Sequence, residues 1–311
     1  VIPAVGDNAF YYCTALTSLE LPSASGKYYS LGASALSYTS ALTEITIPAS
    51  VSSIGKSCFY QSKIKKLPFA DGAVPELGDN AFQSSTIESV VLPKGLTKIS
   101  DYAFGSCQKL KSVVIPSSVE SIGKYAFSGC ILLDTITLET AADGTSKVAF
   151  IGTFAFQKTP IKSFIFPTLA GTKTLDLQAS LFSGCTELDS VYLSKSVGNV
   201  SNVFNGCNTI KHFTVAADNE NFSAKDGDPI LYNKEGTAYK YICGLLSGSH
   251  TIPKNVVEIS ENVFLNQIGL TELFIPYTVQ KIGNNAFQGC TALKKVVFED
   301  GDGHPSQLRV D

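Results

Sequence analysis

Phenylalanine returns along this chain at nearly constant intervals, each time after a small or apolar residue. Successive intervals are 26, 23, 23, 22, 23, 29, 26, 22, 60 and 23 residues. Self-similarity with a period of about 20–50 residues is typical of a solenoid, in which each repeat packs only against its neighbours. The marked positions, with one leucine among them, are Phe10, Leu36, Phe59, Phe82, Phe104, Phe127, Phe156, Phe182, Phe204, Phe264 and Phe287. The sequence therefore predicts a single solenoid domain over residues 1–311, of about 11 to 13 units.

Residues 107–127 show one unit clearly. Leu110, Val113 and Ile115 have the spacing that turns one face of a short strand inward. A proline follows, and because proline cannot donate to a β-ladder, it limits each strand to a few residues. The strand-final prolines are Pro22, Pro48, Pro93, Pro116, Pro167, Pro253 and Pro276. We therefore expect a narrow parallel β-sheet on one side of a right-handed coil.

The segment after each proline is expected to form the side of the coil opposite the sheet. Val119 and Ile122, three residues apart, lead to Gly123, and glycine suits a tight corner. The Ala-Phe pair three residues further on is expected to begin a short helical or 3-10 turn that carries Phe127 into the core. The side opposite the sheet should therefore consist of short helical or 3-10 turns and loops. The first three residues, 1–3, resemble the end of a strand, so we expect the chain to begin inside a repeat.

Six of the eight cysteines lie three residues after a marked position. They are Cys13, Cys107, Cys130, Cys185, Cys207 and Cys290. Disulfide and zinc frameworks need paired spacings, whereas these cysteines recur once per unit in one register. Thr39 and Gln267 fill the same place in two other units. We interpret the position as an inward slot that satisfies loop backbone groups, with reduced, buried thiols and no metal. A set of reactive or metal-binding thiols is the alternative.

Net charge and hydropathy restrict the classes of partner that the chain is expected to bind. The formal net charge is −3, whereas a dedicated nucleic-acid binder needs a basic excess. Uninterrupted apolar stretches, such as residues 148–151, are far shorter than the roughly 20 residues that span a bilayer. We therefore expect no nucleic-acid partner and no membrane-spanning segment.

The repeated string I-G-x-x-A-F-x-x-C-x-x-L-x-x-φ-x-I-P identifies a possible family. It stands in close form at residues 122–138 and 282–298 and resembles the BspA-like leucine-rich repeat family over essentially the whole chain. The resemblance implies a leucine-rich repeat solenoid. It also implies a protein of the bacterial cell surface or the extracellular space, and a protein or glycan ligand whose identity the resemblance does not give.

The 60-residue interval contains a segment, residues 217–250, that resembles the hairpin-bearing insertion of this family. Residues 233–236 form a turn signal between two strand-like runs, residues 229–232 and 237–242. We expect antiparallel pairing only in this inserted β-hairpin, with the regular ladder resuming at Thr251.

The sequence does not support an enzyme. His212, His250 and His304 lie in different contexts, and none belongs to a nucleophile elbow or an H-E-x-x-H segment. The acidic run at residues 299–303 has the composition of a calcium loop but lacks its twelve-residue ligand pattern, so we interpret it as a solvated turn. We expect no catalytic residue, no metal and no cofactor.

The outward position of each strand, between the two inward residues, is apolar in several units. On a sheet with one solvated face this position should be polar, so a recurring apolar side chain indicates a contact surface. The alternative is strand propensity, because Val, Ile, Tyr and Phe suit strands anywhere. The candidate partner-binding residues are Val91, Val114, Ile165, Tyr192, Phe274 and Val297. The charged residues expected beside them are Lys66, Lys111, Lys162, Asp189, Lys211 and Lys295.

Two functions remain open at this point. The first is a non-enzymatic surface or secreted interaction protein that adheres to a host or cell-surface protein or glycan through the sheet face. In that case Tyr192 and Phe274 are the expected anchors, because aromatic side chains supply large contact areas. The alternative is a structural spacer or stalk that presents another domain and has no ligand of its own.

Overall fold

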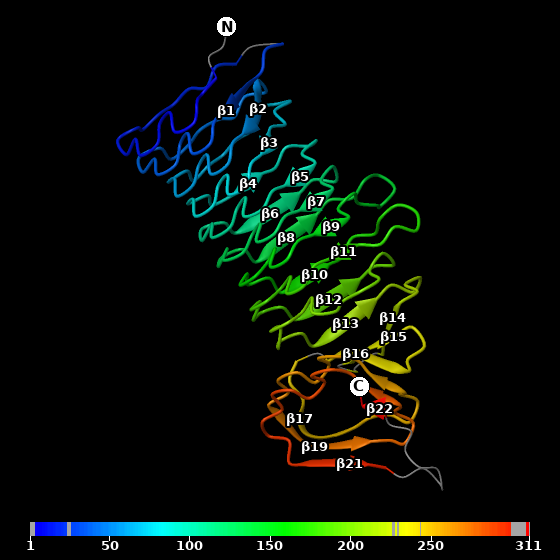
Figure 1. Ribbon diagram of the computed structural model, residues 1–311. Helices are drawn as coiled ribbons and strands as arrows, with labels where there is room; N and C mark the ends of the chain where they lie inside the picture. Colours follow the sequence, from blue (N-terminus) through cyan, green and yellow to red (C-terminus); the bar gives the residue numbers. More distant parts are fainter. Residues whose placement is uncertain are drawn as a thin grey trace. The chain divides into compact units, whose positions relative to one another are not determined.

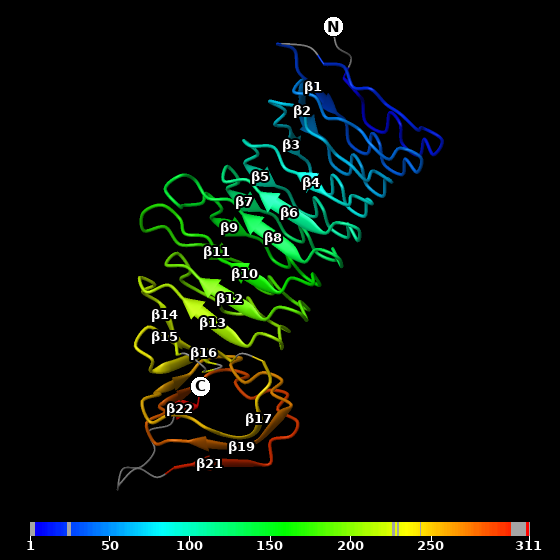
Figure 2. The same cartoon turned by 180° about the vertical axis from the view of Figure 1, so that it is seen from behind.

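The chain folds into two compact units, each a stack of coils (Figures 1 and 2). The computed structural model describes residues 4–23, 26–225, 228, 230–242 and 244–299, and the backbone of residues 309–310. Unit 1 comprises Val1–Glu187 and Val203–Gly206, and unit 2 comprises Leu188–Asn202 and Cys207–Asp311. The predicted parallel solenoid is confirmed, whereas a single domain over the whole chain stays a prediction.

Unit 1 contains two sets of parallel strands, where the sequence predicted one (Figure 1). The predicted strands form the sheet face: β4 (Val90–Val91), β6 (Ser112–Ile115), β8 (Thr135–Leu138) and β10 (Ser163–Ile165). The corner strands are β1 (Tyr29–Leu31), β2 (Val51–Ile54), β3 (Glu76–Leu77), β5 (Lys98–Ile99), β7 (Ser121–Ile122), β9 (Phe150–Ile151) and β11 (Asp176–Leu177). The sequence pattern predicted the second set only as corners, because strands of two to four residues have too little alternation to recognise.

The expectation of short helical or 3-10 turns is wrong for the described residues, which contain no helix. In an α-helix each N–H donates to the fourth preceding carbonyl within the same segment. Here the N–H groups of Tyr102, Phe104 and Ser106 donate instead to the next coil, at 2.8, 2.9 and 2.6 Å from Lys124, Ala126 and Ser128. The intervening N–H groups, such as that of Ala103, which donates to the Ser100 carbonyl, close four-residue turns inside their own coil. We call this pattern the turn ladder.

Left-handed backbone conformations make the turn ladder possible. Tyr102 and Ser106 both have φ of 57°, a conformation that interrupts any helix. The same pair, four residues apart, recurs around every marked position: 8/12, 34/38, 57/61, 80/84, 102/106, 125/129, 154/158, 180/184, 202/206, 262/266 and 285/289. This pair of left-handed residues is therefore shared by all eleven marked units.

The corner glycines are required by close packing between coils and not by φ. A Cβ added to Gly123 would lie 2.6 Å from the Asp101 nitrogen and 2.7 Å from the Ser100 carbonyl carbon. Real Cβ atoms essentially never approach so closely. In the preceding coil Ser100 takes the place of this glycine. Its hydroxyl donates to the Leu77 carbonyl oxygen at 2.5 Å. The backbones of successive coils thus touch at this position.

The marked phenylalanines form one stacked column inside unit 1. Phe104 and Phe127 have ring centroids 5.5 Å apart and planes within 3° of parallel. The other neighbouring pairs from Phe59 to Phe204 are stacked at 5.2 to 5.9 Å. All seven side chains are fully buried. Burial of each phenylalanine contributes about 2–3 kcal/mol, so this column is a main source of stability.

The cysteine slot works as the sequence predicted. The Cys107 thiol donates to the Phe82 carbonyl at 3.1 Å, and the Cys130 thiol donates to the Phe104 carbonyl at 3.1 Å. Other units carry a hydroxyl or an amide here: Thr159 donates to the Phe156 carbonyl at 2.8 Å, and the Gln267 amide donates to the Gly244 carbonyl at 3.0 Å. Four of the six slot cysteines are buried, whereas Cys13 is exposed and Cys290 is half-buried. The expectation of burial is therefore wrong for Cys13, because nearly all of the first described coil is open to solvent.

Unit 2 repeats this architecture and adds the insertion. On its sheet face, β12 (Ser190–Leu193) pairs in parallel with β13 (His212–Val215). A further parallel sheet contains β17 (Ser247–Thr251), β19 (Gly269–Ile275) and β21 (Lys295–Phe298). The regular ladder thus resumes at Ser247 and not, as expected, at Thr251.

The inserted hairpin is confirmed and has a third strand. β15 (Ile230–Asn233) pairs antiparallel with β16 (Ala238–Ile242) and also with β14 (Phe222–Ala224). These are the antiparallel pairs among the strands whose residues the structure describes. β16 then pairs in parallel with β18 (Glu258–Ile259), followed by β20 (Lys281–Ile282) and β22 (Arg309–Val310). The insertion is therefore built into the corner strands of unit 2.

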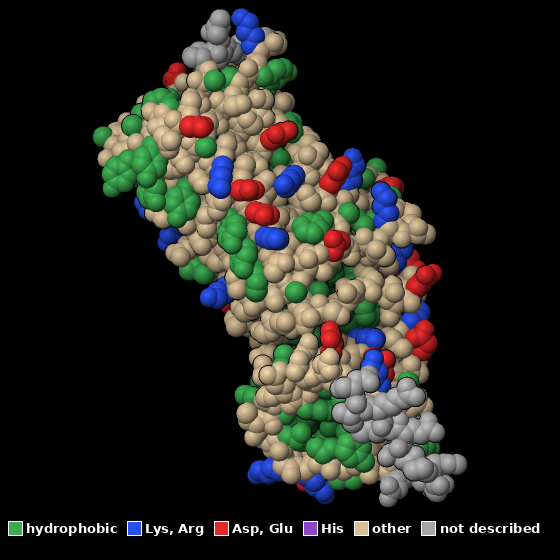
Figure 3. Space-filling view, viewed as in Figure 1, with side chains coloured by type: hydrophobic (Ala, Val, Ile, Leu, Met, Phe, Trp, Pro, Cys, Tyr) green, Lys and Arg blue, Asp and Glu red, His purple; other side chains and the backbone are tan. Residues whose placement is uncertain are grey.

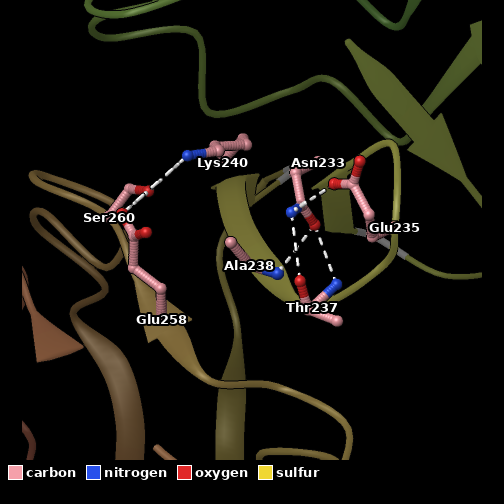
Figure 4. A network of polar contacts seen from close by, with 7 residues as sticks. All are labelled: Asn233, Glu235, Thr237, Ala238, Lys240, Glu258 and Ser260. Carbon is pink, nitrogen blue, oxygen red and sulfur yellow. Dashed lines mark hydrogen bonds and ion pairs between the residues drawn. The ribbon is translucent and has the colours of Figure 1, made fainter. Parts of the chain in front are cut away.

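A polar network fixes the hairpin (Figure 4). The Asn233 side-chain carbonyl accepts from the backbone N–H groups of Thr237 and Ala238, both at 2.8 Å. On the neighbouring strand, Lys240 donates to the Ser260 hydroxyl at 3.1 Å, and that hydroxyl donates to the Glu258 carboxylate at 2.9 Å. These contacts serve the turn and the strand pairing, so they need no ligand to explain them.

Candidate functional site

The sheet face of unit 1 exposes apolar side chains between buried ones. On β4 the side chain of Val91 is 82% exposed, while its neighbours Val90 and Leu92 are buried. Ile165 on β10 is 68% exposed and Val114 on β6 is 43% exposed. The alternation follows from the strand period of two, which turns every second side chain outward. Three of the six predicted site residues therefore lie outward in unit 1.

Two of these three residues are direct neighbours. Val91 and Val114 are register partners in the parallel pair of β4 and β6. The next position in this register belongs to Thr137 on β8, which is polar and exposed. The outward apolar surface of unit 1 is therefore centred on Val91 and Val114, with Ile165 on the separate strand β10.

The other three predicted residues lie in unit 2 and are half-buried. Phe274 on β19 and Val297 on β21 are register partners. Lys295 places its ammonium group 5.6 Å from the centroid of the Phe274 ring, which is within cation–π range. Tyr192 on β12 pairs with Thr214. The two expected aromatic anchors are thus less accessible than the aliphatic residues of unit 1.

A groove of about 590 Å³ lies beside Val91 and was missed by the sequence analysis. Its lining comes from three successive coils, which contribute Glu44, residues 66–74 and residues 89–94 in that order. Val74, which is 41% exposed, and Pro68 contribute apolar surface opposite Val91. We refer to Val91, Val114, Ile165 and this groove as the unit 1 face.

Charges of both signs surround the unit 1 face (Figure 3). The groove is lined by Glu44 and Asp71 as well as by Lys66 and Lys94. In unit 2 the predicted flanking pair Lys211 and Asp189 forms an exposed ion pair at 3.3 Å. Since neither sign dominates, this surface favours no strongly charged ligand.

Within the part of the chain that the structure describes, the titratable groups show no arrangement suited to catalysis. Burial raises the pKa of the Cys107 thiol to about 12, so that at neutral pH it is a protonated hydrogen-bond donor and a poor nucleophile. Burial also lowers the pKa of His250, whose Nε2 lies 3.3 Å from the Tyr239 hydroxyl within the hairpin packing. His212 lies on the exposed edge of β13.

Three expectations depend on residues that lie outside the described part of the chain. These are the start within a repeat at residues 1–3, the acidic turn at residues 299–303, of which the structure describes Glu299 alone, and the context of His304. In the described ranges, no cluster of three or more His, Cys, Asp or Glu side chains has the geometry to hold a metal ion. Within those ranges, too, no helix with the length and apolarity of a membrane span is present.

The coil geometry defines a leucine-rich repeat solenoid, and the family comparison agrees. The family described as BspA type leucine rich repeat region matches in six copies over residues 3–134, 75–151, 97–225 and 238–302. The chain belongs to this family. Proteins of this type bind other proteins or act as scaffolds, and the match indicates no enzymatic family. No curated protein sequence matches the chain at a significant level.

Solved structures of bacterial leucine-rich repeat proteins share the fold. A protein from Bacteroides ovatus is 24% identical with a TM-score of 0.53, and the match covers 94% of this chain and 81% of that protein. A cell-surface protein from Faecalibacterium prausnitzii is 24% identical with a TM-score of 0.51, over 94% of this chain and 64% of that one. A protein from Eubacterium ventriosum is 25% identical with a TM-score of 0.52, and the match covers 68% of this chain. This chain spans 60% of the length of the Eubacterium protein.

Proposed function

We propose that this chain is a non-enzymatic interaction protein of the bacterial surface or extracellular space that adheres to a host or cell-surface protein through the unit 1 face. The observation that supports the proposal best is the exposure of Val91 and Val114 as neighbours on a sheet face. Two adjacent exposed apolar side chains lower the solubility of a protein. A polar residue is compatible with the same strand position, as Thr137 shows on the next strand.

The groove beside Val91 adds shape to this apolar centre. Interfaces draw most of their binding energy from a few apolar or aromatic side chains near their centre, surrounded by polar groups that exclude water. Val91, Val74 and Pro68 provide such a centre, and the mixed charges around the groove provide the rim. A protein ligand with an apolar ridge fits this arrangement better than an acidic glycan does.

The experiment compares the natural chain with a triple variant, Val91→Thr, Val114→Thr and Ile165→Thr, on an array of immobilised matrix proteins and glycans. Threonine keeps the β-branched shape and the strand propensity, so the fold should be retained while the apolar surface is lost. We expect at least a tenfold loss of affinity for whichever array protein the natural chain binds, equal to about 1.4 kcal/mol.

The matched control replaces equally exposed aliphatic residues outside the unit 1 face, Ile131→Thr and Ile268→Thr, and should bind as the natural chain does. Unchanged binding of the triple variant would assign the outward residues to strand propensity and contradict the proposal. If the natural chain bound nothing on the array, the result would favour the alternative function of a structural spacer.

A further inference from the structure

Two inward positions of unit 2 carry polar side chains where their neighbours in the sheets carry aliphatic ones. His250 stands at an inward position of β17, and its register partner on β19 is Leu273. Tyr239 stands at an inward position of the corner strand β16, and its register partner on β18 is Ile259. Tyr239 is fully buried and His250 is half-buried. The inserted segment thus brings a phenol and an imidazole into the core of unit 2.

These two side chains contact each other, and the contacts continue into the hairpin. The Tyr239 hydroxyl lies 3.3 Å from His250 Nε2. The Tyr239 ring meets the Tyr232 ring of β15 edge to face, with centroids 5.3 Å apart. The Tyr232 hydroxyl donates to Asp228 Oδ2 at 2.7 Å. The His250 ring also packs against the Phe264 ring at 5.8 Å. Four polar side chains therefore connect the hairpin to the core of unit 2.

Charged side chains lie on several of the elements around His250. Those that the structure describes are Lys225, Asp228, Lys240, Glu258, Glu261 and Glu272. Of these, the Asp228 carboxylate acts on His250 and favours the protonated imidazole. Lys240 and Glu258 pair with each other at 3.8 Å (Figure 4), and the strand period of two turns Lys240 away from the face that Tyr239 occupies. The apolar surroundings of His250 and the Asp228 carboxylate therefore act on the imidazole in opposite directions.

We propose that the inserted hairpin is an acid-sensitive element whose closed state requires a neutral His250. A neutral imidazole accepts the proton of the Tyr239 hydroxyl at Nε2, whereas an imidazolium carries a proton on both nitrogens and has no acceptor left. Protonation therefore removes this hydrogen bond. It also leaves a positive charge against a hydrophobic cluster that includes Ile252, Phe264 and Leu273. The strand β16 then loosens from the segment that carries β17.

The direction of the pH dependence follows from burial. Burial lowers the pKa of His250 from its usual value of 6.5, and the Asp228 carboxylate opposes this shift less strongly. Burial also raises the pKa of Tyr239, so its hydroxyl keeps the proton that it donates. When the hairpin opens, the imidazole meets water and regains its usual pKa. The open state therefore binds the proton more tightly, and the closed hairpin loses stability as the pH falls below about 6.5.

The test measures hydrogen–deuterium exchange of the full chain at pH 7 and pH 5, with rates corrected for the intrinsic effect of pH on amide exchange. We expect the protection of backbone amides in β15 and β16 to fall at least fivefold at pH 5, while amides of β6 in unit 1 keep their protection. His250→Leu gives this position the residue type of its register partner and should show no such fall. His212→Gln, which removes an exposed histidine of β13, is the matched control and should respond as the natural chain does.

Tyr239→Phe gives a second reading in which the histidine is kept. This variant retains the ring and loses the hydroxyl, so the hairpin should be less protected already at pH 7 and should respond less to acid. Equal protection of β15 and β16 at pH 7 and pH 5 in the natural chain would overturn the proposal. An equal fall in His250→Leu and the natural chain would also overturn it, because carboxylates such as Asp228 would then be responsible. Since the site lies in unit 2 and the test needs no ligand, the result is independent of adhesion through the unit 1 face.

Discussion

The buried phenylalanine is the residue on which each coil depends. Phe127 is fully buried, and its ring stacks against Phe104 at 5.5 Å and against Phe156 at 5.9 Å. Its side chain thus fills space shared by three coils, and the neighbouring backbones are held at a fixed spacing by the turn ladder. A cavity at this site cannot collapse easily, because collapse would break hydrogen bonds on both sides.

Replacing Phe127 by alanine should therefore lower the free energy of unfolding by roughly 3–5 kcal/mol, the usual cost of an emptied aromatic core site. Lys124→Ala, three residues earlier at an exposed position, should change the free energy of unfolding by less than about 0.5 kcal/mol. Urea unfolding of the two variants gives the comparison, and equal effects would mean that the inward register is wrong.

Buried thiols give the fold a predictable dependence on alkaline pH. Burial raises the pKa of Cys58 to about 12. An unfolded chain releases this proton near pH 9, while the folded chain retains it up to about pH 12. Between these values the folded state binds more protons, so the free energy of unfolding falls as pH rises, by at most about 1.4 kcal/mol per pH unit for each such thiol.

Cys58→Ala should make this alkaline loss shallower. Alanine occupies the same position in most other units, for example at Ala81 and Ala103, so the variant should fold normally. Urea unfolding at pH 8 and pH 10 should show a smaller difference for Cys58→Ala than for the natural chain, by about 1 kcal/mol. Identical pH dependence in the two chains would show that this thiol is not held protonated by burial.

At the level of the element, the sequence predicted the strands of the sheet face well and the turns poorly. Val113 and Ile115 turn inward with Val114 outward between them, and this alternation directly predicts the sheet face. The turn side also has a regular sequence, but Ala126 and Phe127 are compatible with a helical turn. What excludes the helix is hydrogen bonding to the next coil, which depends on a neighbour and not on local propensity.

The same difference explains which parts of the candidate site were predicted. Val91, Val114 and Ile165 were predicted because outward positions follow from the strand period. The groove was missed, since it depends on how the segment after Pro68 folds over the next coil.

The corner glycines allow a sharp test of coil packing. A Cβ on Gly55 would lie 2.7 Å from the Gly32 carbonyl carbon, whereas a Cβ on Gly6, the equivalent glycine of the first coil, would meet nothing within 4 Å. Gly55→Ala should therefore lower the free energy of unfolding by about 1–3 kcal/mol, because the backbones of two coils must separate. Gly6→Ala should be neutral or slightly stabilising. Equal melting temperatures for the two variants would contradict close backbone packing at the corner.

At the level of the whole molecule, the chain supplies many copies of one structural unit and only a few places where the surface departs from it. The column, the ladders and the cysteine slot recur and therefore serve stability. Among the described residues, the exposed neighbours Val91 and Val114, the groove beside them and the inserted hairpin depart from the regular repeat. Binding functions are expected at such departures, because a repeat that only maintains the stack has no need of them.

The proposed adhesion is tested most directly by hydroxyl-radical footprinting of the chain with and without the protein that the array identifies. This measurement reports the solvent access of individual side chains, and the proposed contact residues are exposed in the free chain. We predict that Val91, Val114 and Ile165 lose reactivity in the complex while Ile131 and Leu132 keep theirs. Unchanged reactivity at Val91 and Val114, with protection elsewhere on the molecule, would contradict binding through the unit 1 face.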